Sequence, residues 1–408
     1  MIVFLRKFLY QLPGGPPLYH LIWAWLGVLL YSFPSRRIFV IGVTGTKGKS
    51  TVVELIGHIL KTAGRKTALI SSLGIEIAGV RENKPLDNTM PGRFYLQRLL
   101  RRAVAAGCQY AVVEVTSEGV VMNRHRFIDW RAAVFLNLHP EHIEAHKGFE
   151  KYREAKLAFF RYANRPIRIR SSQGVNFINE DDENADFFVE AAGGGRVVFF
   201  RKSELASRLV GKFNKYNLGA AVAVAENLGV DEETIRKAVI DFPGVPGRME
   251  FVQKKPFAVV VDYAHTPVSL EEVYQALRGS AGGRKLICVF GSCGGGRDQW
   301  KRPVLGKIAA QYCDKIILTN EDPFDEPPIA ILDQIERGLL ENQKSEIKNQ
   351  NYWKIVDRKK AIEQAIGLAR PGDAVVITGK GSEEYIRVAG GQKIAWGDQQ
   401  TILDILRK

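Results

Sequence analysis

The sequence predicts an α/β protein with two parallel β-sheets, each covered by helices. Two observations predict this fold class. Residues 38–43 form a short apolar run that leads through a glycine-containing loop into an amphipathic helix, the pattern of a buried parallel strand and its crossover helix. From residue 257 onwards, apolar runs of four or five residues alternate with helical segments, and this alternation implies a second parallel sheet.

The size and charge of the chain set the first bounds on its function. Its 408 residues can bury more than one core. A net charge of +14 suits a polyanionic ligand or an acidic membrane surface. Nucleic acid is disfavoured as a partner, because no long Lys/Arg block with interleaved aromatic residues occurs. The four cysteines lie far apart without a Cys-x-x-Cys pair, so we expect reduced thiols and a cytoplasmic location.

Residues 1–36 form an apolar N-terminal extension. Leu18 to Phe33 is strongly apolar and contains Trp23 and Trp25, but this run is shorter than the roughly 20 residues that span a bilayer. No small-residue cleavage site follows it. We expect a helix that either packs on the domain that follows it or lies in a membrane interface, and the sequence leaves these two alternatives open.

The loop after the first strand has the composition of a phosphate-binding loop. Small residues and glycines let backbone N–H groups close around phosphate oxygens. Lys49 would then reach the β- and γ-phosphates, and the Ser50 hydroxyl would bind Mg²⁺. Val43 stands where the generic pattern has Gly, but strand, loop and helix together predict an ATP site at the helix N-terminus rather than a plain turn. The residues predicted to hold the nucleotide are Thr44, Gly45, Thr46, Lys47, Gly48, Lys49, Ser50 and Thr51.

Two further predicted strands and a helix carry candidate site residues. The strand at residues 110–116 contains Glu114 near its end, and an acidic residue at such a strand tip holds Mg²⁺ directly or through water. After the strand at 132–138, three histidines occur within residues 139–146. Zinc is disfavoured there, because the run lacks a cysteine and a His-Glu-x-x-His spacing. The helix expected at 149–162 would turn Tyr152, Ala155, Phe159 and Tyr162 toward the core, with Lys156 beside that face.

These motifs resemble those of the Mur ligase superfamily, whose members join amino acids to carboxylates of cell-wall precursors, folates and polyglutamates. The residues from Glu114 to Lys156 are similar in order and spacing to the UDP-N-acetylmuramyl-tripeptide synthetase branch. The resemblance implies that Glu114, His142 and Lys156 help to bind Mg²⁺, with Lys156 carbamylated; from the residue alone, Lys156 could equally be an ordinary surface lysine. It also implies that the muramyl-peptide contacts Thr89, Ser117 and Arg124.

The resemblance continues through the segment that joins the two predicted sheets. It places Asn214 and Asn217 on the adenine side of the nucleotide, although Asn214 read by itself could cap a helix. Residues 243–250 are rich in turn formers and read as an interdomain hinge, and the resemblance implies that Arg248 reaches the ATP phosphates. We predict a central P-loop NTPase-like ATP-binding domain at 37–246 and a Rossmann-like ligase domain at 247–408.

The second sheet is expected to carry ligands at the carboxyl ends of its strands. Polar and glycine-rich motifs follow four of its five predicted strands, and such a convergence is hard to assign to packing. The resemblance implies nucleotide binding by Asp262, catalysis by His265, and amino-acid binding by Arg297, Asp322 and Glu383. The five predicted strands are Ala258–Val261, Leu286–Phe290, Lys315–Leu318, Trp353–Val356 and Ala374–Ile377.

The sequence departs from the family pattern in three places. The domain that grips the uridine nucleotide has no counterpart in it, and Glu118 replaces a histidine. Asp322 and Phe324 replace the Asn and Arg that bind the distal carboxylate of diaminopimelate, and a phenylalanine cannot bind a carboxylate as an arginine fork does. We therefore expect a diamine acceptor such as lysine or ornithine, held by the carboxylates of Glu321, Asp322, Asp325 and Glu326.

The sequence thus predicts an ATP-dependent carboxylate–amine ligase that adds an amino acid to a muramyl-peptide through an acyl phosphate. Catalysis would rest on positioning and charge neutralisation by Lys49, Mg²⁺, Arg248 and His265. A folyl- or poly-γ-glutamate ligase and a partner-dependent nucleotide-binding subunit are the alternatives. We expect ATP and Mg²⁺ as cofactors, no nucleic-acid partner and a monomer.

Overall fold

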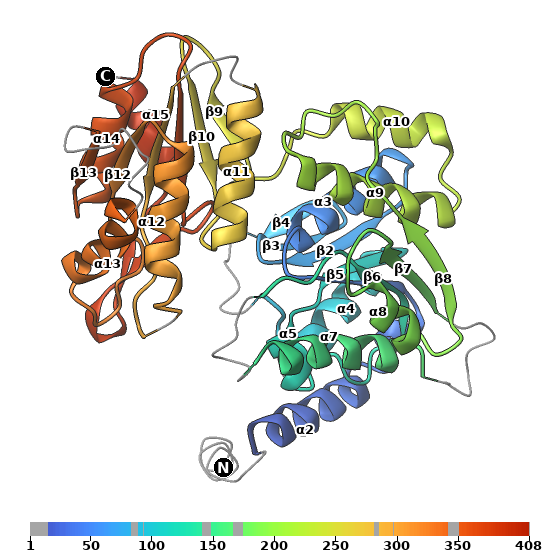
Figure 1. Ribbon diagram of the computed structural model, residues 1–408. Helices are drawn as coiled ribbons and strands as arrows, with labels where there is room; N and C mark the ends of the chain where they lie inside the picture. Colours follow the sequence, from blue (N-terminus) through green and yellow to red (C-terminus); the bar gives the residue numbers. More distant parts are fainter. Residues whose placement is uncertain are drawn as a thin grey trace. The chain divides into compact units, whose positions relative to one another are not determined.

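The computed structural model describes residues 15–82, 89–92, 94–140, 148–165, 174–280, 285–296, 298–341 and 351–407. The chain divides into two compact units. The first unit comprises Met1–Arg208 with Phe213–Phe242, and the second comprises Pro243–Lys408 with Leu209–Lys212. In Figure 1 the first unit runs from blue to yellow-green and the second from yellow to red.

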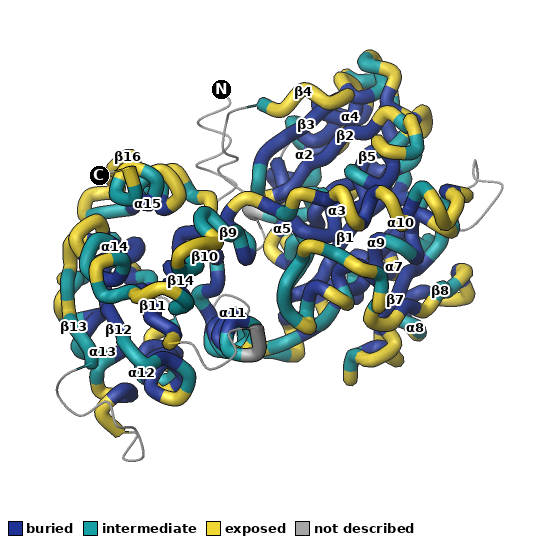
Figure 2. The backbone as a smooth tube through the Cα atoms, turned by 90° about the horizontal axis from the view of Figure 1, so that it is seen from above, coloured by how far each residue is buried: buried dark blue, intermediate teal, exposed yellow. Residues whose placement is uncertain are grey.

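The first unit is built on an eight-stranded sheet with the strand order β4-β3-β2-β5-β1-β6-β7-β8. Six neighbouring strands pair in parallel: β2, β5, β1, β6, β7 and β8. β3 and β4 extend the sheet beyond β2 as an antiparallel edge. Burial follows this order: Figure 2 shows the inner strands in dark blue, as buried, and the edge strand β4 in yellow, as exposed. The strands are β1 (Phe39–Thr44), β2 (Thr67–Ser71), β3 (Gly74–Ile77), β4 (Val80–Glu82), β5 (Tyr110–Glu114), β6 (Trp130–Phe135), β7 (Val175–Asn179) and β8 (Arg196–Phe200).

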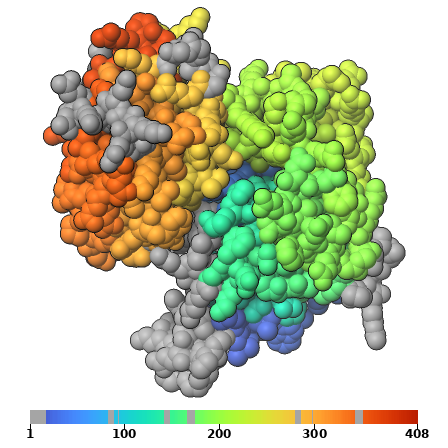
Figure 3. All heavy atoms as spheres, in the orientation of Figure 1, coloured from blue at the N-terminus to red at the C-terminus, as the bar shows by residue number. Residues whose placement is uncertain are grey.

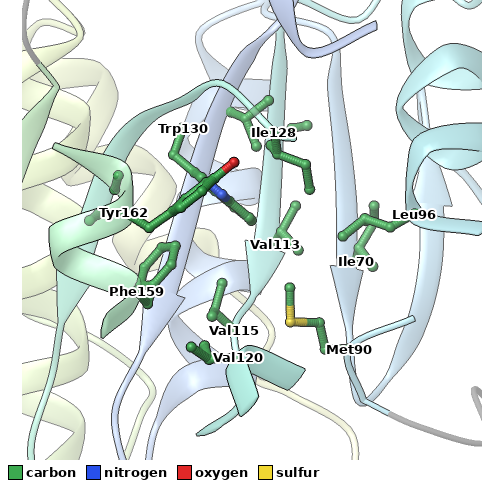
Figure 4. Packing of buried hydrophobic residues seen from close by; sticks show 14 of the residues in the cluster. Ile70, Met90, Leu96, Val113, Val115, Val120, Ile128, Trp130, Phe159 and Tyr162 are labelled. Atoms are coloured by element: carbon green, nitrogen blue, oxygen red, sulfur yellow. The ribbon is translucent and has the colours of Figure 1, made fainter. Parts of the chain in front are cut away.

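Helices cover both faces of this sheet (Figure 1). One face packs against α4, α7 and α8 in a single apolar core, and α3 with its neighbour α10 covers the other. Trp130 and Phe159 pack edge to face in that core with ring centroids 5.1 Å apart (Figure 4). The helices are α2 (Gly15–Leu30), α3 (Lys49–Thr62), α4 (Tyr95–Ala105), α5 (Ser117–Val121), α7 (Phe149–Ala163), α8 (Ala185–Ala191), α9 (Lys212–Asn227) and α10 (Glu232–Asp241), with a short 3₁₀ turn η1 (Pro34–Arg36).

Helix α2 contains the apolar run that the sequence singles out. One face of α2 packs against α4, where a Cβ on Gly27 would lie 2.4 Å from the Cβ of Phe94. The Asn123 side chain also donates to the carbonyl oxygen of Pro17 over 3.2 Å. The prediction of a packed helix is therefore confirmed for this face. No helix in the described ranges is long and apolar enough to cross a membrane.

The second unit is a six-stranded sheet with the order β13-β12-β11-β14-β10-β9. All neighbours pair in parallel except β9, which is antiparallel to β10. The strands are β9 (Glu250–Gln253), β10 (Ala258–Asp262), β11 (Leu286–Phe290), β12 (Lys315–Leu318), β13 (Tyr352–Lys354) and β14 (Ala374–Thr378), and β15 (Tyr385–Arg387) forms a separate hairpin with β16 (Lys393–Ala395).

Helices also flank this second sheet. α14 and α15 supply Ile362 and Ile402 to the apolar core on one face, and α11, α12 and α13 pack next to one another. The Asp357 side chain caps α14 by accepting from the backbone N–H of Lys360, which satisfies one of the donors left open at a helix start. The helices are α11 (Pro267–Ser280), α12 (Lys301–Tyr312), α13 (Pro328–Leu340), α14 (Arg358–Gly367) and α15 (Asp398–Leu406), with a 3₁₀ turn η2 (Ala389–Gly391).

The predicted fold class is confirmed: a parallel sheet that carries the glycine-containing loop precedes a second, Rossmann-like parallel sheet. The predicted strands at 286–290 and 315–318 are β11 and β12 to the residue, and the strand expected at 353–356 is shifted to Tyr352–Lys354. Six strands were not predicted from the sequence: β3, β4, β8, β9, β15 and β16. Five of these strands are only three or four residues long and have no long apolar run to indicate them, whereas β8 was not predicted although residues 197–200 are apolar.

Candidate active site

The phosphate-binding loop connects β1 to α3 in the first unit. Gly48 immediately precedes α3 in the left-handed conformation, with φ of 80°. A Cβ at this position would lie 2.1 Å from Oδ1 of Asn217, so both the backbone conformation and the space require glycine. The loop therefore ends at the N-terminus of the 14-residue helix α3. Backbone N–H groups and the helix dipole favour an anion at this end of a helix.

The loop is held from the neighbouring strand by Asn137. Its side-chain oxygen accepts from the backbone N–H of Thr46 at 3.1 Å and of Lys47 at 2.9 Å, and its amide donates back to the Lys47 carbonyl. The Thr46 hydroxyl lies 3.0 Å from the hydroxyl of Tyr152 on α7. Neither Asn137 nor Tyr152 was predicted to take part in the site, and Tyr152 was expected only to face the core. Asn137 belongs to the stretch from Glu114 to Lys156 that resembles the tripeptide synthetase branch, but no role followed from that resemblance.

Lys49, Ser50 and Glu114 come together as predicted. The Ser50 hydroxyl donates to Oε2 of Glu114 over 2.8 Å, and the backbone N–H of Ser72 donates to the same oxygen over 3.0 Å. The ammonium of Lys49 donates to the carbonyl oxygen of Thr46 and lies 3.9 Å from Oε1 of Glu114. The Glu114 carboxylate is almost completely buried, so a cation and hydrogen-bond donors are needed to hold its charge there.

The donor set at this point fits Mg²⁺. The Glu114 carboxylate and the hydroxyls of Ser50 and Ser72 are all oxygen donors, which this cation prefers. Among the described residues no group of three His, Cys, Asp or Glu could hold a metal, but Mg²⁺ is commonly bound through one or two protein oxygens together with substrate phosphates. Glu114 and Ser50 are therefore the residues that would hold the ion.

Lys156 lies inside the protein rather than on its surface. Its side chain is 1% exposed, its ammonium donates to the carbonyl oxygen of Gly45 over 2.8 Å, and it lies 4.6 Å from the ring centroid of Tyr152. The alternative of an ordinary surface lysine is therefore wrong. Carbamylation of Lys156 stays a prediction.

The predicted asparagine pair lies on α9, beside the Gly48 end of the loop. Asn214 and Asn217 are buried in the first turns of α9, and the Asn217 amide donates to Oδ1 of Asn214 over 2.9 Å. Asn214 is the third residue of α9 and does not cap it. The contact of Asn217 with Gly48 places the pair beside the phosphate loop, which agrees with a role on the nucleotide.

The residues predicted to contact the peptide substrate also lie together. Arg124 donates to the carbonyl oxygen of Met90 over 2.8 Å, next to Thr89. Ser117 opens α5, whose Gly119 packs against the Met90 side chain. Ser117 follows Glu114 by three residues, so the end of β5 connects Glu114 directly to this group.

In the second unit, the hinge segment folds back onto the end of β10. Asp262 is buried and accepts from the backbone N–H groups of Met249 at 2.7 Å and Ala264 at 2.6 Å. These bonds position Arg248, whose guanidinium lies 4.1 Å from the ring centroid of Tyr263. Asp262 therefore shapes the backbone around Arg248, a role that the predicted nucleotide contact did not include.

The motifs after β10 and β14 meet, as their positions at strand ends predict. The Tyr263 hydroxyl donates to Oε1 of Glu383 over 3.3 Å, and burial together with the Glu383 charge raises the pKa of Tyr263 far above its usual value. Nδ1 of His265 lies 2.8 Å from the carbonyl oxygen of Tyr263. A proton on Nδ1 would donate to that oxygen, which leaves Nε2 as the accepting nitrogen of a neutral ring. Buried Lys380 pairs with Glu383.

The carboxylates expected to hold a diamine already have partners or are buried. Asp322 accepts from the ammonium of Lys380 at 2.8 Å and from the backbone N–H of Arg387 at 2.9 Å. Glu326 pairs with buried Arg302, and Asp325 accepts from the backbone N–H of Gly390. Burial raises the pKa of Glu321, despite the nearby cations of Lys301, Lys380 and Arg358. These contacts remove the ground on which lysine or ornithine was favoured.

A cation lies close to Phe324 instead. The Arg387 guanidinium is 5.9 Å from the Phe324 ring centroid and 5.1 Å from that of Tyr385, and its Nε lies 4.0 Å from Oδ2 of Asp322. The backbone N–H of Phe324 donates to the carbonyl oxygen of Arg387 over 3.2 Å. The β15–β16 hairpin thus brings an arginine beside Phe324.

Two predicted site residues, His142 and Arg297, lie outside the described residues. Within the first unit the structure brings together the predicted loop, Glu114, Lys156 and the asparagine pair. Within the second unit it brings together Arg248, Asp262, His265, Asp322 and Glu383, through contacts of Met249, Tyr263 and Lys380.

Known proteins share this architecture. Residues 43–225 match the Mur ligase middle domain, and residues 247–381 match the Mur ligase, glutamate ligase domain. The chain is 36% identical to UDP-N-acetylmuramoyl-L-alanyl-D-glutamate–2,6-diaminopimelate ligase of Syntrophomonas wolfei, across 94% of this chain and 81% of that enzyme. It is 38% identical to the enzyme of the same name from Gloeobacter violaceus, across 93% and 79%.

Solved structures of such ligases have a similar fold. A UDP-N-acetylmuramoyl-L-alanyl-D-glutamate–2,6-diaminopimelate ligase is similar with a TM-score of 0.64 and 26% identity, over 95% of this chain and 82% of that one. Folylpolyglutamate synthase of Mycobacterium tuberculosis has a TM-score of 0.71 over 93% of this chain and 95% of that one, but only 17% identity, so it shows the fold alone. The loop, the strand-end motifs and the sequence identity along nearly the whole chain lead to one conclusion: this protein belongs to the Mur ligase family and is an acid–amino-acid ligase.

Proposed function

We propose that this chain uses ATP to join an amino acid to the terminal carboxylate of a muramyl-peptide in the cytoplasm. The carboxylate oxygen takes the γ-phosphoryl group of ATP, and ADP leaves. The amino group of the incoming amino acid then attacks the acyl carbon of this acyl phosphate, and phosphate leaves as the amide bond forms.

One observation carries this proposal. β5 ends in Glu114, which Ser50 of the phosphate loop contacts at 2.8 Å, and three residues later Ser117 opens the helix that packs on Met90. The predicted nucleotide and peptide contacts are thus parts of one continuous segment. A ligase that transfers phosphate to a carboxylate needs these two substrates side by side.

The residues of the loop would act by positioning and charge neutralisation. Lys49 would exchange its bond to the Thr46 carbonyl for a phosphate oxygen, and Ser50 and Glu114 would hold Mg²⁺. When bound, Mg²⁺ would offset the negative charge of the transferred phosphoryl group. We propose that Arg248 and His265 stabilise charge during the reaction, and that Glu383 binds the amine of the amino acid.

We propose 2,6-diaminopimelate as the amino acid, and Arg387 as the group that binds its distal carboxylate. The relatives at 36–38% identity are ligases of this amino acid. Arg387 lies beside Phe324, whereas Asp322 is neutralised by Lys380. A guanidinium forms strong bidentate hydrogen bonds with a carboxylate, so it can replace the arginine missing at position 324.

ADP release by the purified full chain tests the proposed function. With ATP, Mg²⁺ and UDP-N-acetylmuramoyl-L-alanyl-D-glutamate, we expect ADP release that depends on diaminopimelate, with lysine at least about tenfold less effective in kcat/KM. The Lys49→Ala variant is the inactive control. Release with a folate or polyglutamate acceptor and glutamate instead would support the folyl-type alternative. A purified chain that turns over only after a second protein is added would support the partner-dependent subunit.

A further inference from the structure

The outer face of α2 is a continuous apolar stripe. Its six large side chains are between 36% and 69% exposed. They recur at intervals of three or four residues, which places them on one side of the helix. The stripe consists of Leu18, Ile22, Trp25, Leu26, Leu29 and Leu30.

This stripe is not left over from packing on the rest of the protein. The opposite face of α2 is already occupied, since Tyr19, Ala24 and Val28 are buried and Phe94 of α4 packs against Gly27. The sequence of α2 contains no Asp, Glu, Lys or Arg. In the space-filling view the blue N-terminal residues form part of the surface of the first unit (Figure 3). Soluble proteins rarely expose a contiguous apolar patch of this kind without a binding role.

Several arginines lie near α2. Exposed Arg36 and Arg37 follow the helix in the chain. Arg98 and Arg101 are exposed on α4, at the helical positions next to Phe94 and Gln97, which contact α2 at Gly27. On another side, Leu21 of α2 lines a pocket that also contains two arginines, Arg126 and Arg165.

We propose that α2 binds the surface of an anionic lipid bilayer, with the apolar stripe in the interface and the surrounding arginines on the lipid headgroups. An apolar face with tryptophan and arginine at its margins is the pattern of a helix that lies in the plane of a membrane. Because one face of α2 is packed on α4, only its outer apolar face can insert into the bilayer interface. Charge complementarity selects anionic lipid, because arginines follow α2 in the chain, are exposed on α4 and line the pocket at Leu21, whereas the stripe has no charge of its own.

Sedimentation of the full chain with lipid vesicles tests the proposal, and it does not depend on the proposed reaction. We expect the wild type to pellet with vesicles of phosphatidylcholine and phosphatidylglycerol, and at least about tenfold less with phosphatidylcholine alone. The Trp25→Glu/Leu29→Glu variant should lose at least tenfold in binding. Arg98→Gln/Arg101→Gln should weaken the preference for phosphatidylglycerol, because it removes two of the six arginines. The matched control is Val80→Glu, which places the same charge at an exposed apolar site on β4 and should bind as the wild type does.

Solubility and ADP release of each variant report on folding, and single Leu29→Glu serves if the double variant does not fold. Wild type that stays in the supernatant with both vesicle types would overturn the proposal. Equal binding by wild type and Trp25→Glu/Leu29→Glu would do the same. A concentration-dependent dimer that these substitutions abolish, without vesicle binding, would assign the stripe to a second copy of the chain instead.

Discussion

The ammonium of Lys156 donates to the carbonyl oxygen of Gly45 over 2.8 Å, although the two residues are 111 positions apart in the sequence. One helical turn earlier on α7, Tyr152 contacts the Thr46 hydroxyl. Helix α7 therefore holds the phosphate loop with two side chains, and Lys156 supports the nucleotide site even without a carbamate.

Replacing Lys156 with alanine should reduce turnover by about 10²-fold or more, because the loop loses a positioning contact. If a carbamate on Lys156 also serves the metal, added bicarbonate should raise wild-type activity and acetate should restore part of the activity of Lys156→Ala. The control is Lys151→Ala, which removes an exposed lysine from the same helix. Full activity of Lys156→Ala would contradict both roles, and loss without acetate rescue would leave the loop contact as the role of this residue.

Gly48 and Gly64 form a natural pair for testing the loop. Both flank α3 with positive φ, of 80° and 70°, so alanine costs roughly 1–2 kcal/mol of backbone strain at either position. Only at Gly48 would the added Cβ meet Asn217, at 2.1 Å. We expect Gly48→Ala to abolish ATP binding in calorimetry, whereas Gly64→Ala should lower the unfolding free energy and leave ATP affinity unchanged. Similar ATP affinities of the two variants would show that the loop does not approach the nucleotide as described.

The phosphate loop could be predicted from neighbouring residues alone. Strand, glycine loop and helix are contiguous, so their pattern at residues 38–60 identified the site directly. Asn137 was missed because its role depends on β6 lying next to β1 in the sheet, and the order of parallel strands cannot be read from their apolar runs.

In the second sheet, too, contacts between segments that are far apart in the sequence could not be predicted. Its strand-end motifs were predicted to converge because carboxyl ends of parallel strands meet at one edge. Arg387 escaped notice because it lies on a three-residue strand, which is too short for a periodic signal. The acidic residues 321–326 looked available for a ligand until the structure showed Lys380 and Arg302 beside them.

Replacing Arg387 with alanine should remove the preference for diaminopimelate. A charge-assisted hydrogen bond contributes about 1.5–3 kcal/mol, so kcat/KM for diaminopimelate should fall about 10- to 100-fold while that for lysine changes little. Arg387→Lys should retain part of the preference, because a single ammonium still attracts the carboxylate. The control is Arg337→Ala, at an exposed position of α13. A parallel loss for both amino acids would assign Arg387 to the hairpin structure, and a wild type that prefers lysine would restore the expectation from the sequence.

His125 should make the first unit less stable at acidic pH. The ring is buried, packs edge-on against Tyr162 at 4.8 Å, and its Nδ1 has no hydrogen-bond partner among the described residues. Burial, with a smaller contribution from the Arg126 and Arg165 charges, lowers the pKa of His125 to about 3. Between about pH 6.5 and 3 the unfolded chain binds a proton at this histidine and the folded chain does not, so the unfolding free energy falls as the pH falls.

The His125→Phe variant isolates this effect, because phenylalanine keeps the aromatic contact and cannot be protonated. We expect the stability difference between the variant and the wild type to shift in favour of the variant below pH 6.5, by up to about 1.4 kcal/mol per pH unit, and to stay constant above pH 7. Urea unfolding followed by circular dichroism between pH 4 and 8 measures it. His58→Phe is the matched control, since burial also lowers the pKa of His58 but its ring is less deeply buried, so its shift should be smaller. A stability difference for His125→Phe that does not change with pH would mean that His125 binds its proton equally in the folded and unfolded chains.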